Sequence, residues 1–231
     1  MPSDPSSASS TGPAPVYLDL PSWPRRDTFE FYRGFDKPYF NLCTRLDVAA
    51  LKAATQAAGA SFSLACHFIA TNLANREEAF RYRLEDGRVR VHPVVHASTT
   101  VLRDDGSFAF AYLPFDPCFA DFAARGVPVL AAARQGSFEP HDDSTAVLHF
   151  TTLPWVHFTS FSHARNWGRE DAVPKLAFGR IDVDGAHAWM PLSVEVHHAL
   201  MDGLHVGQFV QGFEAALQDP QSWLQPRPES G

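Results

Sequence analysis

The feature that most constrains the fold lies near the end of the chain, where a strand-like run is followed at once by a turn signal and a helical pattern. The run WMPLSVEVHH, residues 189–198, is rich in β-branched and apolar residues and predicts a buried strand. Asp202 and Gly203 form a turn signal after it. Apolar residues then recur at helical spacing, at Val206, Phe209, Val210, Phe213 and Leu217. This order predicts a strand, a tight turn and a closing amphipathic helix.

The remaining segments mix strand and helix patterns without regular alternation. Residues 41–48 alternate like a strand, whereas 48–60 and 62–75 have helical character. Strands are expected in three β-branched and aromatic runs, RVRVHPVVHASTTVL, FAFAYLPF and AVLHFTTLPWVHFTSF, with a helix over 117–134 between the last two. The pattern predicts an α/β or α+β two-layer sandwich, not a Rossmann or TIM-barrel fold. The lack of GxGxxG and GxxxxGK[ST] motifs agrees with this.

One globular domain is expected to follow a short N-terminal tail. Residues 1–15 consist almost entirely of Pro, Ser, Ala, Gly and Thr with one acid, which leaves too little apolar surface to offset the entropy of ordering. We therefore expect a disordered tail there. Over residues 16–231 no Pro-, Gly- or Ser-rich break or internal repeat occurs, and 45% of the whole chain is hydrophobic. A single domain with one sizeable core is the prediction.

Composition and charge argue against several classes of partner. The 19 Lys and Arg against 26 Asp and Glu give a net charge of -7, so nucleic acid is not expected as the main partner. Cys43, Cys66 and Cys118 are widely spaced without a CxxC pair, which predicts free thiols and no zinc site. No signal peptide or membrane-spanning run is evident. These observations predict a cytoplasmic protein with no membrane association.

The richest concentration of reactive side chains is the segment VEVHHALMDGLHVGQF, residues 194–209, which puts His198 at a strand end beside an ordered turn. Two ordinary explanations apply: a histidine at a strand end is usually bonded to a backbone group, and Asp202 before a glycine is a common first residue of a helix. A metal site formed by His198, Asp202 and His205 is disfavoured, because no second ligand cluster appears and a strand–turn–helix does not put the three on one face. The residues alone leave these alternatives open.

Three stretches in the same order carry a resemblance that bears on this choice. HHxxxDG lies between a strand and an amphipathic helix, WPRRDTFEFYR lies near the start, and LPWVHFTSF lies in the middle. From Tyr17 to Leu217 the chain resembles the chloramphenicol acetyltransferase family, which shares a superfamily with dihydrolipoamide acyltransferase cores and peptide-synthetase condensation domains. The resemblance implies a mixed sheet covered by helices. It also implies acetyl transfer from acetyl-CoA to a hydroxyl of chloramphenicol or a similar compound, in a ternary complex without an acyl-enzyme.

The resemblance further implies a role for each matched residue. His198 would be the general base that takes the hydroxyl proton and returns it to the departing CoA thiolate, a task that suits an imidazole. Asp202 would pair with Arg25 of the WPRR motif as an electrostatic brace. Ser160 would donate to the oxyanion of the tetrahedral intermediate. His197 is expected to be structural.

Acceptor binding is expected to use an aromatic pocket and CoA binding a tunnel. The residues that match the family's acceptor pocket are Phe31, Tyr32, Phe40, Phe108 and Phe138. Each of these, taken singly, is also typical of a protein core. Arg180 stands where the family commonly has a basic residue for CoA, and no metal is expected. The residues that depart from the family pattern are Asp36, Pro38, Phe110 and Ala177.

The resemblance implies a homotrimer whose sites lie at the subunit interfaces. The first alternative is an acyltransferase of the same fold with a different alcohol acceptor, which the departures at Asp36, Pro38 and Phe110 favour. The second is a non-catalytic ligand-binding member of the fold, for which Ala177 is a weak argument. Whether the activity serves antibiotic resistance or metabolism is left open by the sequence.

Overall fold

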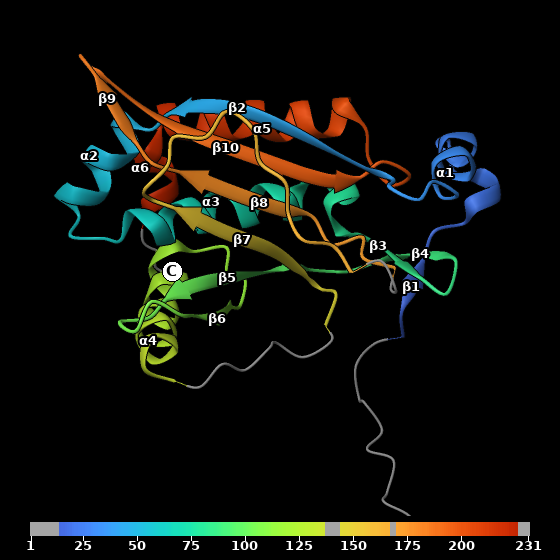
Figure 1. The fold of residues 1–231 in the computed structure, drawn as a ribbon, viewed down its shortest axis with the longest axis horizontal. Helices are drawn as coiled ribbons and strands as arrows, with labels where there is room; N and C mark the ends of the chain where they lie inside the picture. The colour runs from blue at the N-terminus through green and yellow to red at the C-terminus, as the bar shows by residue number, and fades with distance from the viewer. Residues whose placement is uncertain (1–13, 137–143, 167–169, 226–231) are drawn as a thin grey trace, which may run out of the picture.

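The computed structural model describes residues 14–136, 144–166 and 170–225, and a seven-stranded mixed sheet forms its centre (Figure 1). The strands of this sheet are β2 (Tyr39–Asp47), β5 (His96–Leu102), β6 (Phe108–Leu113), β7 (Val147–Leu153), β8 (Lys175–Gly179), β9 (Asp182–Asp184) and β10 (His187–His197). Their order is β2-β10-β8-β7-β5-β6, with β9 paired to β10. The β5–β7 and β7–β8 pairs are parallel and the others antiparallel. The predicted α/β sandwich with a mixed sheet is confirmed.

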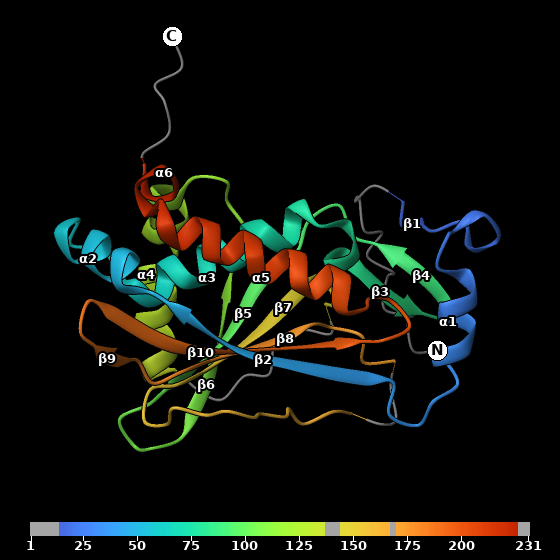
Figure 2. The same ribbon diagram turned by 90° about the horizontal axis from the view of Figure 1, so that it is seen from above.

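Helices cover one face of this sheet, and the long connection from β7 to β8 crosses the other face (Figure 2). The helices are α2 (Ala49–Ala57), α3 (Phe62–Arg76), α4 (Phe119–Gln135), α5 (Gly203–Gln218) and α6 (Pro220–Leu224). The core lies between the two layers, where α3 is buried on nearly all sides and α5 contributes Phe209 and Phe213. Because apolar positions recur at helical spacing along α5, that helix presents one continuous face to the sheet.

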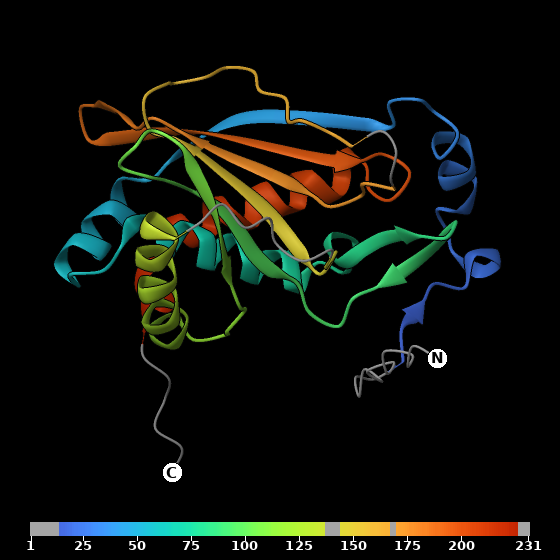
Figure 3. The same cartoon turned by 60° about the horizontal axis from the view of Figure 1, so that its bottom comes forward.

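A smaller sheet lies at one end of the molecule, beside α1 (Figure 3). It contains β1 (Val16–Tyr17), β4 (Arg88–Val91) and β3 (Tyr82–Glu85), and is accompanied by α1 (Arg26–Tyr32) and the short 3-10 helices η1 (Leu20–Ser22) and η2 (Glu78–Arg81). Asp86 and Gly87 join β3 to β4 with φ angles of 51° and 71°. Two left-handed residues in a row are the geometry of the tight hairpin turns that Asp-Gly favours.

Most predicted elements are confirmed, and two runs differ. The run RVRVHPVVHASTTVL forms two strands, β4 and β5, because Pro93 has no N–H for a ladder. The run that ends at Phe161 is a strand only as far as Leu153, and from Pro154 the chain enters the connection on the open face. The prediction of a strand around Ser160 was therefore wrong. Strands β3 and β8 were not predicted, because short runs of this kind lack a clear period.

The three cysteines are free thiols, as expected, with Cys66 and Cys118 buried. Among the described residues, no single helix is long and apolar enough to span a membrane; α2 and α3 reach that length only together, across a bend of 119°. Of the N-terminal tail for which disorder was predicted, residues 1–15, the first 13 lie outside the described residues.

Gly179, at the end of β8, allows the β7–β8 connection to lie directly against the sheet. A Cβ atom there would approach Val156 O and Pro191 Cγ to 2.9 Å, and Phe158 Cδ1 to 3.1 Å. Because one of these neighbours is backbone, we expect Gly179→Ala to lower the free energy of unfolding by about 1–3 kcal/mol. Gly207→Ala in α5 is the control, since a Cβ there meets nothing within 4 Å. Equal denaturation midpoints for the two variants would contradict the prediction.

Candidate active site

His198 is the first residue after β10 and is held by backbone groups on two sides. Its N–H donates to Pro38 O at 2.6 Å, and its Nδ1 lies 3.2 Å from Met201 O. Because a carbonyl oxygen can only accept, this contact puts the ring proton on Nδ1 and leaves the lone pair on Nε2. The ring stacks on Tyr32 with centroids 3.9 Å apart and lies 4.8 Å from the ring of Phe40. The result is a half-buried imidazole of fixed orientation with a basic Nε2.

Arg25, at the start of α1, ties the turn that follows His198 to the N-terminal helix. Its Nε lies 3.3 Å from Asp202 Oδ2, and its Nη1 and Nη2 donate to Ala199 O and His198 O at 3.2 and 3.4 Å. The guanidinium also lies over the ring of Trp23 at 5.5 Å. One side chain thus contacts three residues of the turn, and the ion pair expected between Arg25 and Asp202 is present.

Asp202 also immediately precedes α5 and caps the start of that helix. Its Oδ1 accepts from Leu204 N at 3.0 Å and lies 2.9 Å from His205 Nδ1. Burial acts to raise the pKa of Asp202, but the neighbouring His205, the Leu204 N–H and Arg25 outweigh it and hold that pKa below its ordinary value. Among the described residues, no group of three His, Cys, Asp or Glu side chains is arranged to hold a metal ion.

The lowered pKa of Asp202 gives a testable pH dependence. A carboxylate whose pKa is depressed in the folded state stabilises the protein above its unfolded pKa, and this contribution is lost as the pH falls through the folded value. We expect Asp202→Asn to lower the unfolding midpoint at pH 7, and the difference from the parent protein to shrink below about pH 4. Thermal unfolding of both proteins across this range measures the effect. A difference that stays constant with pH would contradict it.

His197, unlike His198, is almost fully buried. It is only 4% exposed, its Nδ1 accepts from Ala199 N at 3.3 Å, and its ring packs edge-on against Tyr39. Burial lowers the pKa of His197 to about 4, and the positive charge of Arg165 acts in the same direction. A neutral imidazole with its acceptor atom already bonded suits the structural role expected for it.

Three of the aromatic candidates gather around His198. Tyr32 and Phe40 contact its ring, and Phe31 packs against Tyr32 with centroids 4.9 Å apart. Phe31 is 63% exposed, so most of its ring faces solvent in the single chain. An exposed aromatic ring beside a fixed imidazole offers a surface on which a ligand or another protein chain can pack.

Within one chain, Phe108 is not brought to His198. Phe108 lies on the edge strand β6, which is four strand spacings from β10 in the sheet order, or roughly 19 Å at about 4.8 Å per spacing. Ser160 is exposed in the β7–β8 connection and lies on no strand. Phe138 lies outside the described residues. Within the described part of one chain, the candidate base His198 and Phe108 therefore lie far apart.

Arg180 follows β8 and borders an apolar cavity of about 320 Å³ on another side of the molecule. The cavity is lined by residues that include Phe62, Ile181 and Met190. Arg180 Nε donates to Asp182 Oδ1 at 2.9 Å, and its Nη1 to Trp155 O at 3.3 Å. An apolar slot with a cation at its rim has the character needed for a long ligand with an anionic end.

Of the four residues that depart from the family pattern, three line cavities and one is buried in strand β8. Asp36 and Pro38 line a small cavity of about 210 Å³ that His197 also borders. Phe110 lines a cavity of about 430 Å³ on the open face of the sheet. Ala177 is fully buried in β8, opposite Ser193 of β10.

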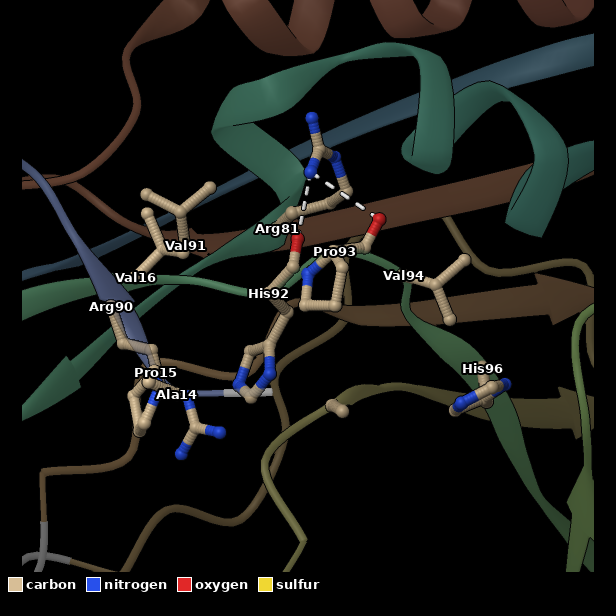
Figure 4. Close-up of a pocket in the computed structure, with 11 residues that line it drawn as sticks. Ala14, Pro15, Val16, Arg81, Arg90, Val91, His92, Pro93, Val94 and His96 are labelled. Carbon is tan, nitrogen blue, oxygen red and sulfur yellow. Dashed lines mark hydrogen bonds between the residues drawn. The ribbon is translucent and has the colours of Figure 1, made fainter. Parts of the chain in front are cut away.

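A further cavity, of about 880 Å³, lies between the small sheet and the start of β5 (Figure 4). It is lined by residues of β1, β4 and the following segment, including Arg90, Val91, His92 and His96. Arg81 Nη1 donates to His92 O at 2.7 Å at its edge, and burial lowers the pKa of His92 to about 4. None of the site residues predicted from the sequence lines this cavity, so its size alone does not make it the candidate site.

Sequence reasoning missed a buried ionic cluster beside the β10 terminus. Arg165 of the connection donates from Nε to Glu195 Oε1 at 2.8 Å and from Nη1 to Asp171 Oδ1 at 3.1 Å, while Lys175 Nζ donates to Asp171 Oδ2 at 2.8 Å. The Arg165 guanidinium also lies over the ring of Tyr39 at 4.2 Å. These contacts join the segment after Ser160 to the strands β8 and β10. The one sequence signal for this cluster is Glu195, a charged residue within the LSVEV strand.

Comparisons with known proteins show the family to which the sequence is similar. The family model described as chloramphenicol acetyltransferase matches residues 16–214. A chloramphenicol acetyltransferase from Streptomyces acrimycini is 33% identical over 216 residues, which cover 92% of this chain and 98% of the relative. Chloramphenicol acetyltransferase 3 from Escherichia coli is 26% identical over 197 residues, or 84% of this chain and 92% of that one.

Solved structures are similar in fold. A chloramphenicol acetyltransferase structure matches with a TM-score of 0.81 and 22% identity, over 88% of this chain and all of that one. The dihydrolipoamide acetyltransferase of Azotobacter vinelandii matches with a TM-score of 0.63 and 16% identity, over 97% of this chain and all of that one. At these identities the likeness concerns the fold alone.

Proposed function

The chain belongs to the chloramphenicol acetyltransferase family and is an acetyltransferase, and from this premise we propose that it moves the acetyl group of acetyl-CoA to a hydroxyl of chloramphenicol or a similar compound. The observation that carries the proposal is His198, whose Nδ1 faces Met201 O so that Nε2 is the basic atom, between the rings of Tyr32 and Phe40. Alcohols are weak nucleophiles at neutral pH, and a positioned imidazole is the common solution.

The proposed reaction uses one base twice. His198 Nε2 removes the hydroxyl proton while the oxygen attacks the thioester carbonyl carbon. Ser160 donates to the oxyanion of the resulting tetrahedral intermediate. The C–S bond then breaks, and His198 returns the proton to the CoA sulfur, so that charge and atoms balance. Asp202 and Arg25 hold the turn in place and do not relay protons.

We further propose that the site is completed between two copies of the chain in a homotrimer. The support is the distance along the sheet between the His198 group and Phe108, together with the exposure of Phe31 beside His198. One chain then supplies the base and a second supplies Ser160 and Phe108. The three free thiols support a cytoplasmic location.

The function is tested by incubating the purified protein with acetyl-CoA and chloramphenicol and following free thiol over time. Release of thiol that depends on the drug supports the proposal. Release with another alcohol but not with chloramphenicol would favour the alternative of a different acceptor, for which Phe110 in the open-face cavity is the specific observation. No release with any alcohol would overturn the proposed activity.

Arg180 is proposed to bind the anionic part of acetyl-CoA at the rim of the apolar cavity. Because it is exposed and already paired with Asp182, its contribution is that of one solvent-screened surface charge. Arg180→Gln is expected to raise KM for acetyl-CoA about 5-fold with kcat unchanged. Arg90→Gln, which removes an ion pair at the small sheet, is the control. An equal rise of KM in the two variants would contradict the assignment.

A further inference from the structure

The cavity on the open face of the sheet has a composition that the proposed reaction does not explain. It measures about 430 Å³ and borders the connection that carries Ser160. The residues that matter for its chemistry are Ser98, Phe110, His149, Phe161, His163 and Lys175. Strands β5, β7 and β8 supply the polar members of the floor, and aromatic rings supply the walls. A cavity for a purely apolar ligand would not carry a hydroxyl, two imidazoles and an ammonium.

Two polar atoms around this cavity are buried without a partner among the described residues. Ser98 is 2% exposed and its Oγ makes no hydrogen bond, and His163 Nε2 is buried and equally unpaired. Nη2 of Arg165, which follows the lining residue Ala164 in the sequence, is also buried without a partner among the described residues. Buried polar groups in native proteins are nearly always bonded, and those that are not call for a bonding partner. A ligand that fills the cavity and accepts hydrogen bonds would supply that partner.

The charges around the cavity favour a negative ligand. Among the described residues that line it, Lys175 alone carries a formal charge at neutral pH, and its partner Asp171 is not part of the lining. Burial lowers the pKa of His149 and of His163 to about 4; the charge of Lys175 acts in the same direction and that of Asp171 in the opposite one. Both imidazoles are therefore neutral. An anion placed in the cavity therefore faces the Lys175 ammonium and no lining carboxylate among the described residues.

We propose that this cavity binds an anionic, hydrogen-bond-accepting group, of which a carboxylate is the simplest example, on an aromatic alcohol that accepts the acetyl group. Ser98 and His163 donate to the anion, and Phe110 and Phe161 pack against the aromatic body. The inference rests on the proposed acetyl transfer, because it assigns the class of acceptor for that reaction. It accounts for Phe110, one of the residues that depart from the family pattern.

A matched pair of acceptors tests the proposal. The probes are 4-(hydroxymethyl)benzoate and its methyl ester, which share ring and hydroxyl and differ in charge. Thiol release with acetyl-CoA gives kcat/KM for each, and calorimetric titration in the presence of CoA gives each Kd. The full-length parent protein is expected to favour the carboxylate at least 10-fold. Ser98→Ala and His163→Phe are each expected to lower kcat/KM for the carboxylate about 10-fold and to leave the ester unchanged.

Thr71→Val is the control, because Thr71 on α3 also has a buried hydroxyl without a partner among the described residues but does not line this cavity. This variant is expected to keep the preference for the carboxylate. Equal kcat/KM for the two acceptors in the parent protein, or equal losses on both acceptors in Ser98→Ala, would overturn the proposal. Should no thiol be released from either acceptor, the Kd values decide. Tighter binding of the carboxylate that Ser98→Ala abolishes supports the cavity although transfer fails, whereas equal or undetectable binding overturns it.

Discussion

Replacement of His198 by alanine is expected to lower kcat by about 10²–10⁴-fold while the fold and CoA binding persist. The reason is positional as well as chemical. The Nδ1 contact with Met201 O sets the tautomer, and the rings of Tyr32 and Phe40 set the plane, so that Nε2 is held as a base before substrate arrives. The adjacent His197 is not equivalent, because it is buried with its Nδ1 already bonded to Ala199 N.

The measurement is single-wavelength detection of free thiol at saturating acetyl-CoA, with CoA affinity followed by calorimetry. His187→Ala is the matched control, since it removes an exposed histidine at the opposite end of β10 and is expected to keep full activity. Retention of a tenth or more of the kcat by His198→Ala would contradict the role of His198 as general base. Loss of CoA binding together with activity would point instead to a structural effect.

The strand, turn and closing helix could be predicted from the sequence because each depends on a local signal. Apolar periodicity from Val206 onward defines α5, and Asp202 before Gly203 marks its first residue, where the carboxylate does cap Leu204 N. The placement of His198 follows from the same local order, since it is the residue after β10. Local patterns of this kind need no knowledge of the rest of the chain.

What could not be predicted depends on contacts between distant segments. Pro38 O, which accepts from His198 N, is 160 positions away in sequence, and the Arg165–Glu195 contact spans 30. Arg83 is a further case: it is 1% exposed, and four carbonyl oxygens, two of them from Thr145 and Val147, satisfy its guanidinium. A buried arginine of this kind has no signature in its own neighbourhood.

A mixture of two inactive variants is expected to regain activity if the site is shared between chains. His198→Ala keeps Ser160, and Ser160→Ala keeps His198, so neither homotrimer has a complete site. In a mixed trimer the His198 of one chain meets the Ser160 of its neighbour at one of the three interfaces. Each mixed trimer therefore has one complete site, and activity is expected to rise from the background of either variant to as much as about a third of the parent value.

The physical basis of this expectation is the separation, in one chain, of His198 from Phe108, which is proposed to act on the same side of the site as Ser160. His198 follows β10, and Phe108 starts β6, four strand spacings away in the sheet order, so no movement of side chains brings them together. The two variants are co-expressed with different affinity tags, mixed trimers are purified through both tags, and thiol release is compared with that of each pure variant. Light scattering gives the number of subunits. An inactive mixed trimer, or a monomer with full parent activity, would contradict the shared site, because each would require His198 and Ser160 to act within one chain.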